Sequence, residues 1–356
     1  MSDAIWSAEP TTPEAIERAL RQLVHERHTE NGGFVPGRTL NLVCFVDRAY
    51  VGEALNRLRT AGRNQPSRLI LLTYEPRRTA LEGRVVVAAR DDPQPAGGPI
   101  ALFETVRVAL GERHLDDLET IVDPLVATDV PTLLWAPHGH RDVLERLAPL
   151  AQAALLDSAA HQRWQSGLRQ AAELSDHLYV VDLAWVRPAP WRARLAAAFS
   201  RPQRRAELEA ISSLTVSHHP DYTASALLLA GWMASRLGWR VAPLFAQEGH
   251  GAVASGKVRG RRQEVRVVLR GRPDEQAPGL SEVVVETAGG RALTLSRGPG
   301  GLHAHERLPR GGERRWVILG ASRGEGGVLG EGIRQALLRD PTYLPALQAA
   351  QGLAPL

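Results

Sequence analysis

Short runs of consecutive apolar residues alternate with helical patterns along the first 160 residues. Arg38–Asp47, Ser67–Glu75 and Val130–Pro137 are apolar and rich in branched side chains, as expected for buried strands. Ala49–Gly62, between the first two, has helical spacing and ends at a glycine. Because strand, helix, strand is the pattern of a βαβ unit, we predict a layered α/β domain with a largely parallel sheet over residues 1–160.

The pattern becomes mostly helical over residues 161–205. We expect helices from His161 to Phe199, interrupted where Pro188 and Pro190 prevent helix until after the second proline. We therefore assign residues 161–205 to a helical connector between two domains.

From residue 206 onward, valines alternate with charged residues, which is typical of an antiparallel sheet with one wet face. Ser281–Arg297 contains the turn Ala288-Gly289-Gly290-Arg291, which predicts a hairpin. An apolar helix is expected at Tyr222–Gly238, and helices end the chain. The predicted fold class is thus α/β, with a C-terminal α+β domain over residues 206–356.

Composition narrows the class of protein. The chain has 356 residues, 44% of them hydrophobic, and a net charge of +4, with acidic and basic residues interspersed. We therefore expect no nucleic-acid partner. The apolar runs are too short to cross a bilayer, and the N-terminus lacks a signal-peptide pattern. We expect a cytoplasmic protein without a membrane partner.

Two residue types occur once each and limit the possible chemistry. Cys44 is the single cysteine and lies in an apolar run, so no intramolecular disulfide can form and we expect inert packing. Lys257 is the single lysine, which excludes lysine chemistry at every other position.

One glycine-rich stretch resembles a phosphate-binding loop. Gly320, Gly324 and Gly326 follow an apolar strand and precede a helix, with spacing that would let backbone amides approach a phosphate. Only about 30 residues remain after it, which is too few for the further βαβ units of a dinucleotide fold. We interpret the stretch as a turn into a C-terminal helix, with weak anion binding as the alternative.

No catalytic or metal-binding constellation emerges from the rest of the chain. His303 and His305 share one face of a predicted strand, and His138 and His140 share a loop, but zinc requires three or four ligands. The serine elbow of hydrolases and the P-loop are both missing. We expect no metal, no cofactor and no catalytic residue.

The stretch DLAWVRPAPWRARLAAAF, residues 182–199, is the most distinctive in the chain. Trp191, Leu195 and Phe199 fall four residues apart on one helix face, which we expect to be packed inward. Arginine and tryptophan are also enriched at interface hot spots. The motif therefore either fastens the two domains together or contacts a partner. Its candidate residues are Asp182, Trp185, Arg187, Pro190, Trp191 and Arg192.

This motif closely resembles the Asp-Leu-Ala-Trp-x-Arg-x-x-Pro-Trp-Arg signature of the glucose-6-phosphate dehydrogenase assembly protein family (OpcA). Three other segments are similar to that family in order and spacing. They are RTLNLVCFVD with NQPSRLILL, VDPLVATDVPTLLWAP, and YTASALLLAGWMASRLGWRV.

The resemblance implies a non-catalytic protein that binds glucose-6-phosphate dehydrogenase, promotes its active oligomer and supports NADPH production in the oxidative pentose phosphate pathway. An enzyme that binds a sugar phosphate or nucleotide at the Gly320–Gly326 loop remains the alternative.

Overall fold

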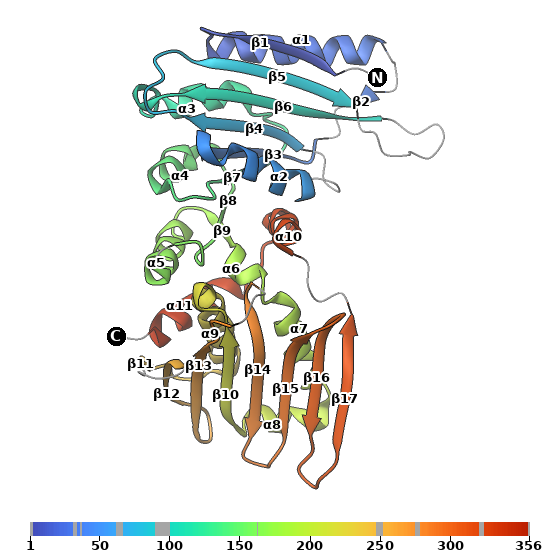
Figure 1. Ribbon diagram of the computed structural model, residues 1–356, viewed down its shortest axis with the longest axis vertical. Coiled ribbons are helices and arrows are strands. Elements are labelled where there is room, and N and C mark those ends of the chain that lie inside the picture. The colour runs from blue at the N-terminus through green and yellow to red at the C-terminus, as the bar shows by residue number, and fades with distance from the viewer. Residues whose placement is uncertain are drawn as a thin grey trace. The chain divides into compact units, whose positions relative to one another are not determined.

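The computed structural model describes residues 3–30, 34–35, 38–61, 67–89, 100–161, 163–246, 252–274, 278–319 and 324–354. Contacts divide the chain into two compact units (Figure 1). Unit 1 contains residues 1–156, 177–181 and 325–337, and unit 2 contains the remainder. Both units are therefore discontinuous in sequence. The sequence instead predicted three continuous segments with boundaries at residues 160 and 205. Those boundaries stay a prediction.

Unit 1 is built on a nine-stranded sheet over its described residues, in the order β1-β5-β6-β4-β3-β7-β8-β9, with β2 paired to β6. The strands are β1 (Ala4–Ala8), β2 (Phe34–Val35), β3 (Leu40–Asp47), β4 (Ser67–Tyr74), β5 (Glu82–Ala89), β6 (Ile100–Leu110), β7 (Thr132–Trp135), β8 (Ala153–Leu156) and β9 (Tyr179–Asp182). The central strands β6, β4, β3, β7 and β8 are mutually parallel, and β1 and β5 are antiparallel additions. The largely parallel sheet is confirmed.

The helices of unit 1 are α1 (Pro13–Glu30), α2 (Val51–Ala61), α3 (Leu118–Val122), α4 (Arg141–Leu147) and most of α10 (Gly324–Leu338). Thr12 has the residue type that favours an N-cap and precedes Pro13 at the first helical position. It caps α1, since its Oγ1 accepts a hydrogen bond from Ala15 N at 3.3 Å. The pattern of residues 114–129 predicts a helix, but α3 is shorter than that span, because Pro124 lies in a 3₁₀ turn that follows it.

Unit 2 is built on an eight-stranded sheet over its described residues, in the order β11-β12-β13-β10-β14-β15-β16-β17. The strands are β10 (Ile211–His218), β11 (Phe245–Ala246), β12 (Ala252–Arg259), β13 (Glu264–Gly271), β14 (Leu280–Thr287), β15 (Ala292–Gly298), β16 (Gly301–Arg307) and β17 (Glu313–Leu319). All neighbours are antiparallel except β10 and β13, which are parallel. The predicted hairpin joins β14 to β15, with Gly290 at φ +83°.

The helices of unit 2 are α5 (Trp164–Ser175), α6 (Leu183–Val186), α7 (Ala189–Ala198), α8 (Pro202–Leu208), α9 (Thr223–Leu237) and α11 (Tyr343–Leu353). The apolar helix α9 is almost wholly buried and packs against α11. Gly231 lies at that contact, where an added Cβ would come within 2.3 Å of the Ala346 carbonyl oxygen.

Two expectations for residues 161–199 were wrong. The segment contains β9, a four-residue strand too short to stand out among helical patterns. Helix also forms on both sides of Pro188: α6 precedes it, and α7 includes Pro190 in its first turn. A proline is tolerated there because its missing N–H would have had no partner within the helix.

Candidate functional site

Asp182 is the centre of a buried polar cluster at the start of the Trp- and Arg-rich motif. Its Oδ1 accepts hydrogen bonds from Ala184 N at 2.9 Å, which caps α6, and from Ser158 N at 3.0 Å. The Tyr343 hydroxyl donates to its Oδ2 at 3.2 Å. Burial and, secondly, the nearby carboxylate of Asp157 raise the pKa of Asp182 to about 6, against the opposing effect of these hydrogen bonds. Asp182 therefore joins three separate segments of unit 2.

Arg187 forms a two-pronged ion pair with Asp157. Its Nη1 donates to Asp157 Oδ1 at 2.8 Å, and its Nη2 donates to Oδ2. Both side chains are about nine-tenths buried, and the guanidinium also lies over the Tyr222 ring. This geometry needs the planar fork of arginine, because lysine offers only a point charge.

Trp185 and Arg192 pack directly against each other. The Arg192 guanidinium lies 3.4 Å from the centroid of the Trp185 ring, and its Nη1 donates to the Trp185 carbonyl oxygen at 2.6 Å. The Trp185 indole N–H donates to Asp340 Oδ2 at 3.0 Å. Burial lowers the pKa of Arg192, while the nearby Asp340 carboxylate opposes that shift.

The helix face shared by Trp191, Leu195 and Phe199 is buried, as the spacing predicted. Pro190 lies in the first turn of α7, half-buried. All the partners described for this motif belong to unit 2, so the motif joins segments within one unit. Sequence reasoning missed three of those partners: Asp157, Asp340 and Tyr343. No local signal marks them, because they lie 30 to 161 residues from the side chains they contact.

The glycine-rich stretch is divided by the structure. Gly320 lies outside the described residues. Gly324 begins α10 with φ +62°, and an added Cβ there would meet open space. At Gly326 an added Cβ would lie 2.5 Å from Thr60 Cγ2, so the absent side chain lets α10 approach α2 closely. Close packing of the two helices therefore explains the glycine at position 326 without a bound anion.

Unit 1 has the strand order of a dinucleotide-binding sheet. Numbered along the chain from β3 and without the antiparallel β5, the parallel strands β6 to β8 run 3-2-1-4-5, with β9 next in the sheet. The strand order reverses between β3 and β7. In sheets of this kind, ligands bind outside the carboxyl ends of the strands at that reversal, and a glycine-rich loop after the first strand lets backbone amides reach the pyrophosphate.

The residues at this reversal do not fit a pyrophosphate. The residues from the end of β3 to the start of α2, Asp47-Arg48-Ala49-Tyr50, include no glycine, and Gly52 follows only in the first turn of α2. The Asp47 carboxylate lies 3.1 Å from His140 Nε2. The Tyr50 ring stacks on His138 at 4.0 Å between centroids. Glu53 adds a second carboxylate in the first turn of α2. Two carboxylates, Asp47 and Glu53, therefore lie where a phosphate would bind, and they would repel its negative charge.

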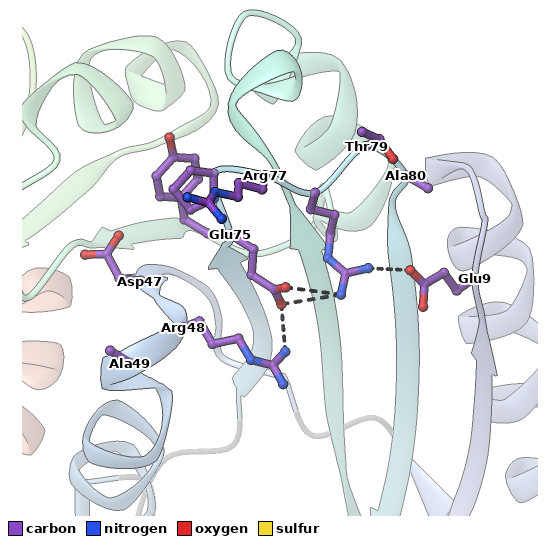
Figure 2. A pocket seen from close by; sticks show the side chains of 11 residues that line it. Glu9, Asp47, Arg48, Ala49, Glu75, Arg77, Thr79 and Ala80 are labelled. Atoms are coloured by element: carbon purple, nitrogen blue, oxygen red, sulfur yellow. Dashed lines mark hydrogen bonds and ion pairs between the residues drawn. The ribbon is translucent and has the colours of Figure 1, made fainter.

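A cavity of about 680 Å³ lies at the carboxyl ends of β3 and β4 (Figure 2). Its charged lining residues are three arginines and three carboxylates: Arg48, Arg77, Arg78, Glu9, Asp47 and Glu75. Glu75 binds both Arg48, at 2.7 Å, and Arg78, at 3.3 Å, and Arg78 also binds Glu9. Since opposite charges balance, the cluster holds the loop after β4 in place and creates no strong field for an anion.

The two histidines of β16 and the single cysteine do not form a metal site with one another or with the neighbours that the structure describes. His303 and His305 lie on one face of β16 as expected, and His305 contacts Glu313. Within the described ranges, no three histidine, cysteine or acidic side chains are placed to share a metal ion. Cys44 is fully buried, and burial raises its pKa. None of the described helices is long and apolar enough to span a bilayer.

Two family models match most of the chain. The "Glucose-6-phosphate dehydrogenase subunit N-terminal domain" matches residues 59–173, and the corresponding C-terminal domain matches residues 178–347. Relatives named "Putative OxPP cycle protein OpcA" come from Synechococcus elongatus, 29% identical over 141 residues, and Nostoc punctiforme, 32% identical over 130 residues. These alignments cover 38% and 35% of this chain, and 32% and 28% of the relatives, so the matched segment spans about a third of their length.

Solved structures resemble the chain only distantly. A myo-inositol 2-dehydrogenase from Lactobacillus plantarum is 10% identical with a TM-score of 0.48, covering 88% of this chain and 96% of that one. Such a likeness supports no statement about activity. The two domain matches, in the expected order, instead establish that the chain belongs to the OpcA family of glucose-6-phosphate dehydrogenase assembly proteins.

Proposed function

We propose that this protein is a non-catalytic factor that binds glucose-6-phosphate dehydrogenase and promotes its active oligomer in the oxidative pentose phosphate pathway. The observation that carries this proposal is the match of both OpcA domains over residues 59–173 and 178–347. Supply of NADPH would follow from activation of the dehydrogenase, which is the enzyme that carries out the chemistry.

The place in unit 1 where the strand order reverses, between β3 and β7, supports a role without catalysis. Asp47 and Glu53 place two carboxylates where a dinucleotide-binding sheet presents a glycine-rich loop to the negatively charged pyrophosphate. A protein that only binds its partner can still change the partner's activity. If it binds the active oligomer more tightly than the inactive form, it shifts the population toward the active one by that difference in affinity.

A titration tests the proposal directly. The dehydrogenase from the same organism is mixed with increasing amounts of this protein, and activity and oligomer mass are followed by rate assay and by size-exclusion chromatography with light scattering. We expect co-elution together with higher activity or a larger oligomer. The protein alone should convert neither glucose 6-phosphate nor NADP. Unchanged activity and separate elution across the whole titration would refute the proposal.

The enzyme alternative gives a different result in a thermal-shift assay. A sugar phosphate or NADP that binds the Gly320–Gly326 region would raise the melting temperature, since a ligand stabilises the folded state by RT ln(1 + [L]/Kd). We expect no shift, because Gly326 at the end of that region packs against Thr60. Stabilisation by NADP that is lost in Gly324→Val would favour the alternative.

A further inference from the structure

A groove in unit 2 is lined by residues of helices α7 and α8, of the turn between them, and of the outer strands β15, β16 and β17. Figure 1 labels these elements. It encloses about 300 Å³. The residues that line it from the helices and the turn between them are Arg194, Ala197, Ala198, Arg201 and Arg204, and from the strands Leu293, Leu295, Glu306, Arg314, Trp316 and Ile318. The motif helix α7 thus has two different faces: Trp191 and Leu195 are buried, whereas Arg194 and Ala197 line the groove.

The apolar floor of the groove is left uncovered toward the edge of the sheet. In the strand register, Leu295 pairs with Ala304 and Ala304 pairs with Trp316, which places all three side chains on one face. Leu295 and Ala304 are 1% and 2% exposed, whereas Trp316 is 41% exposed. On the opposite face of β17, Val317 and Leu319 are also exposed. Large apolar side chains on both faces of one strand are costly in water and are typical of a binding surface.

The rim of the groove carries arginines with spare capacity for negative charge. Arg194, Arg201 and Arg314 are exposed, and the described part of the chain offers no ion-pair partner for any of them. Arg204 is 3.0 Å from Glu306, and Glu306 is also 2.6 Å from Arg291. The single carboxylate of the groove is therefore fully engaged, and the groove presents an excess of positive charge.

Strand β17 is also a free edge. Among the described strands it pairs only with β16, over seven residues from Glu313 to Leu319. An edge strand keeps a row of unpaired N–H and C=O groups that another strand can bind. Edge addition uses these backbone groups for affinity and alternate side-chain positions for specificity.

Building on the proposed function, we propose that the groove and the β17 edge bind an extended segment of glucose-6-phosphate dehydrogenase that carries alternating apolar and acidic side chains. The segment adds to the sheet beside β17, covers Trp316 with its apolar side chains, and pairs its carboxylates with Arg194, Arg201 and Arg314. A second copy of this chain is a poorer occupant, because its β17 would bring a second set of the same arginines to the groove.

Variants of the groove test this inference with the full-length protein and the cognate dehydrogenase. We expect Trp316→Ser to raise the Kd at least tenfold, because a central tryptophan is often an interface hot spot. Arg194→Glu combined with Arg201→Glu should also weaken binding at least tenfold and should reduce the dependence of the association rate on salt. Hydrogen exchange should show new protection of the amides of residues 313–319 in the complex.

Matched controls separate the groove from general effects. Tyr50 has a similar exposure of 44%, so Tyr50→Ser controls for loss of an exposed aromatic side chain. Arg266 and Arg270 are exposed arginines on β13, so their double change to glutamate controls for net charge. Both controls should bind like wild type, and all variants should melt like wild type.

The outcomes separate the two proposals. If wild type does not bind the dehydrogenase, the proposed function fails and this inference fails with it. If wild type binds and the groove variants bind equally well, only the inference is overturned. If the groove variants change self-association while dehydrogenase binding is unchanged, the occupant is a second copy of the chain and the inference is wrong.

Discussion

The buried motif and the groove use the same residue types for opposite purposes. In the motif, Arg192 lies against Trp185 and Arg187 binds Asp157, so both of these arginines have partners and little of their surface is left. In the groove, Arg194 and Trp316 are exposed, and the structure describes no ion pair for that arginine. An Arg- and Trp-rich sequence therefore does not by itself indicate a partner surface. An arginine or tryptophan that is buried and paired stabilises the fold, whereas one that is exposed and unpaired is available to bind a partner.

Removal of the buried aromatic of the motif should have the largest effect on stability. Trp191→Ala empties a site in which the ring is 3% exposed, so we expect a loss of about 3–5 kcal/mol in the free energy of unfolding. Chemical denaturation measures this loss. Dehydrogenase activation should fall only in proportion to the unfolded fraction.

Breaking the Arg187–Asp157 ion pair should have the second-largest effect on stability. Arg187→Ala leaves a nearly buried carboxylate without its partner and should cost about 3 kcal/mol. Arg187→Lys should recover only part of that, because it cannot make both parallel hydrogen bonds. Equal stability of Arg187→Lys and wild type in urea would show that the two-pronged geometry is unimportant.

Asp182 makes the stability of the buried motif depend on pH. Its pKa is raised from an ordinary value near 3.8 to about 6, so the folded state binds this proton more tightly than the unfolded state does. The stabilisation is complete below pH ~4 and is lost as the pH rises through about 6, with a total of about 2–3 kcal/mol. In Asp182→Asn this contribution to the slope should vanish. Unfolding free energies of both proteins at several pH values between 4 and 7 measure the difference, and parallel curves would contradict the assignment.

Substitution of Cys44 should have the smallest effect on stability and on binding of the dehydrogenase. Its thiol is buried and its pKa is raised by burial, so thiol reagents should not change the complex with the dehydrogenase. Cys44→Ser should cost about 1–2 kcal/mol through burial of a hydroxyl and should leave any response to reductant unaltered. A reductant effect that is present in wild type and absent in this variant would mean that Cys44 is accessible.

Local patterns predicted most of the elements but few of the contacts between them. The continuous apolar runs of β3 and β4, the Thr12 cap of α1 and the Gly290 turn are each encoded within a few residues, and all were found. Strands β1, β6, β9 and β12 were missed: β1 and β9 are short, and the charged residues Glu104 and Arg107 interrupt the apolar run of β6.

The candidate site was predictable only in its local part. The buried face of Trp191, Leu195 and Phe199 follows from helical spacing. The dinucleotide-type strand order could not be read, because β3 and β7 pair across about 90 residues of chain. The groove was not anticipated either, since the apolar residues of β17 read as an ordinary strand until the register placed them at an open edge.

The central claim is that the buried motif stabilises the protein while the groove binds the dehydrogenase. Melting temperature and dehydrogenase activation, measured together on Trp191→Ala and Trp316→Ser, test it most directly. We predict that Trp191→Ala lowers the melting temperature and keeps activation at temperatures where it is folded, whereas Trp316→Ser melts like wild type and loses activation. The opposite result, Trp191→Ala with wild-type melting and no activation beside a fully active Trp316→Ser, would contradict the claim and make the motif the docking site.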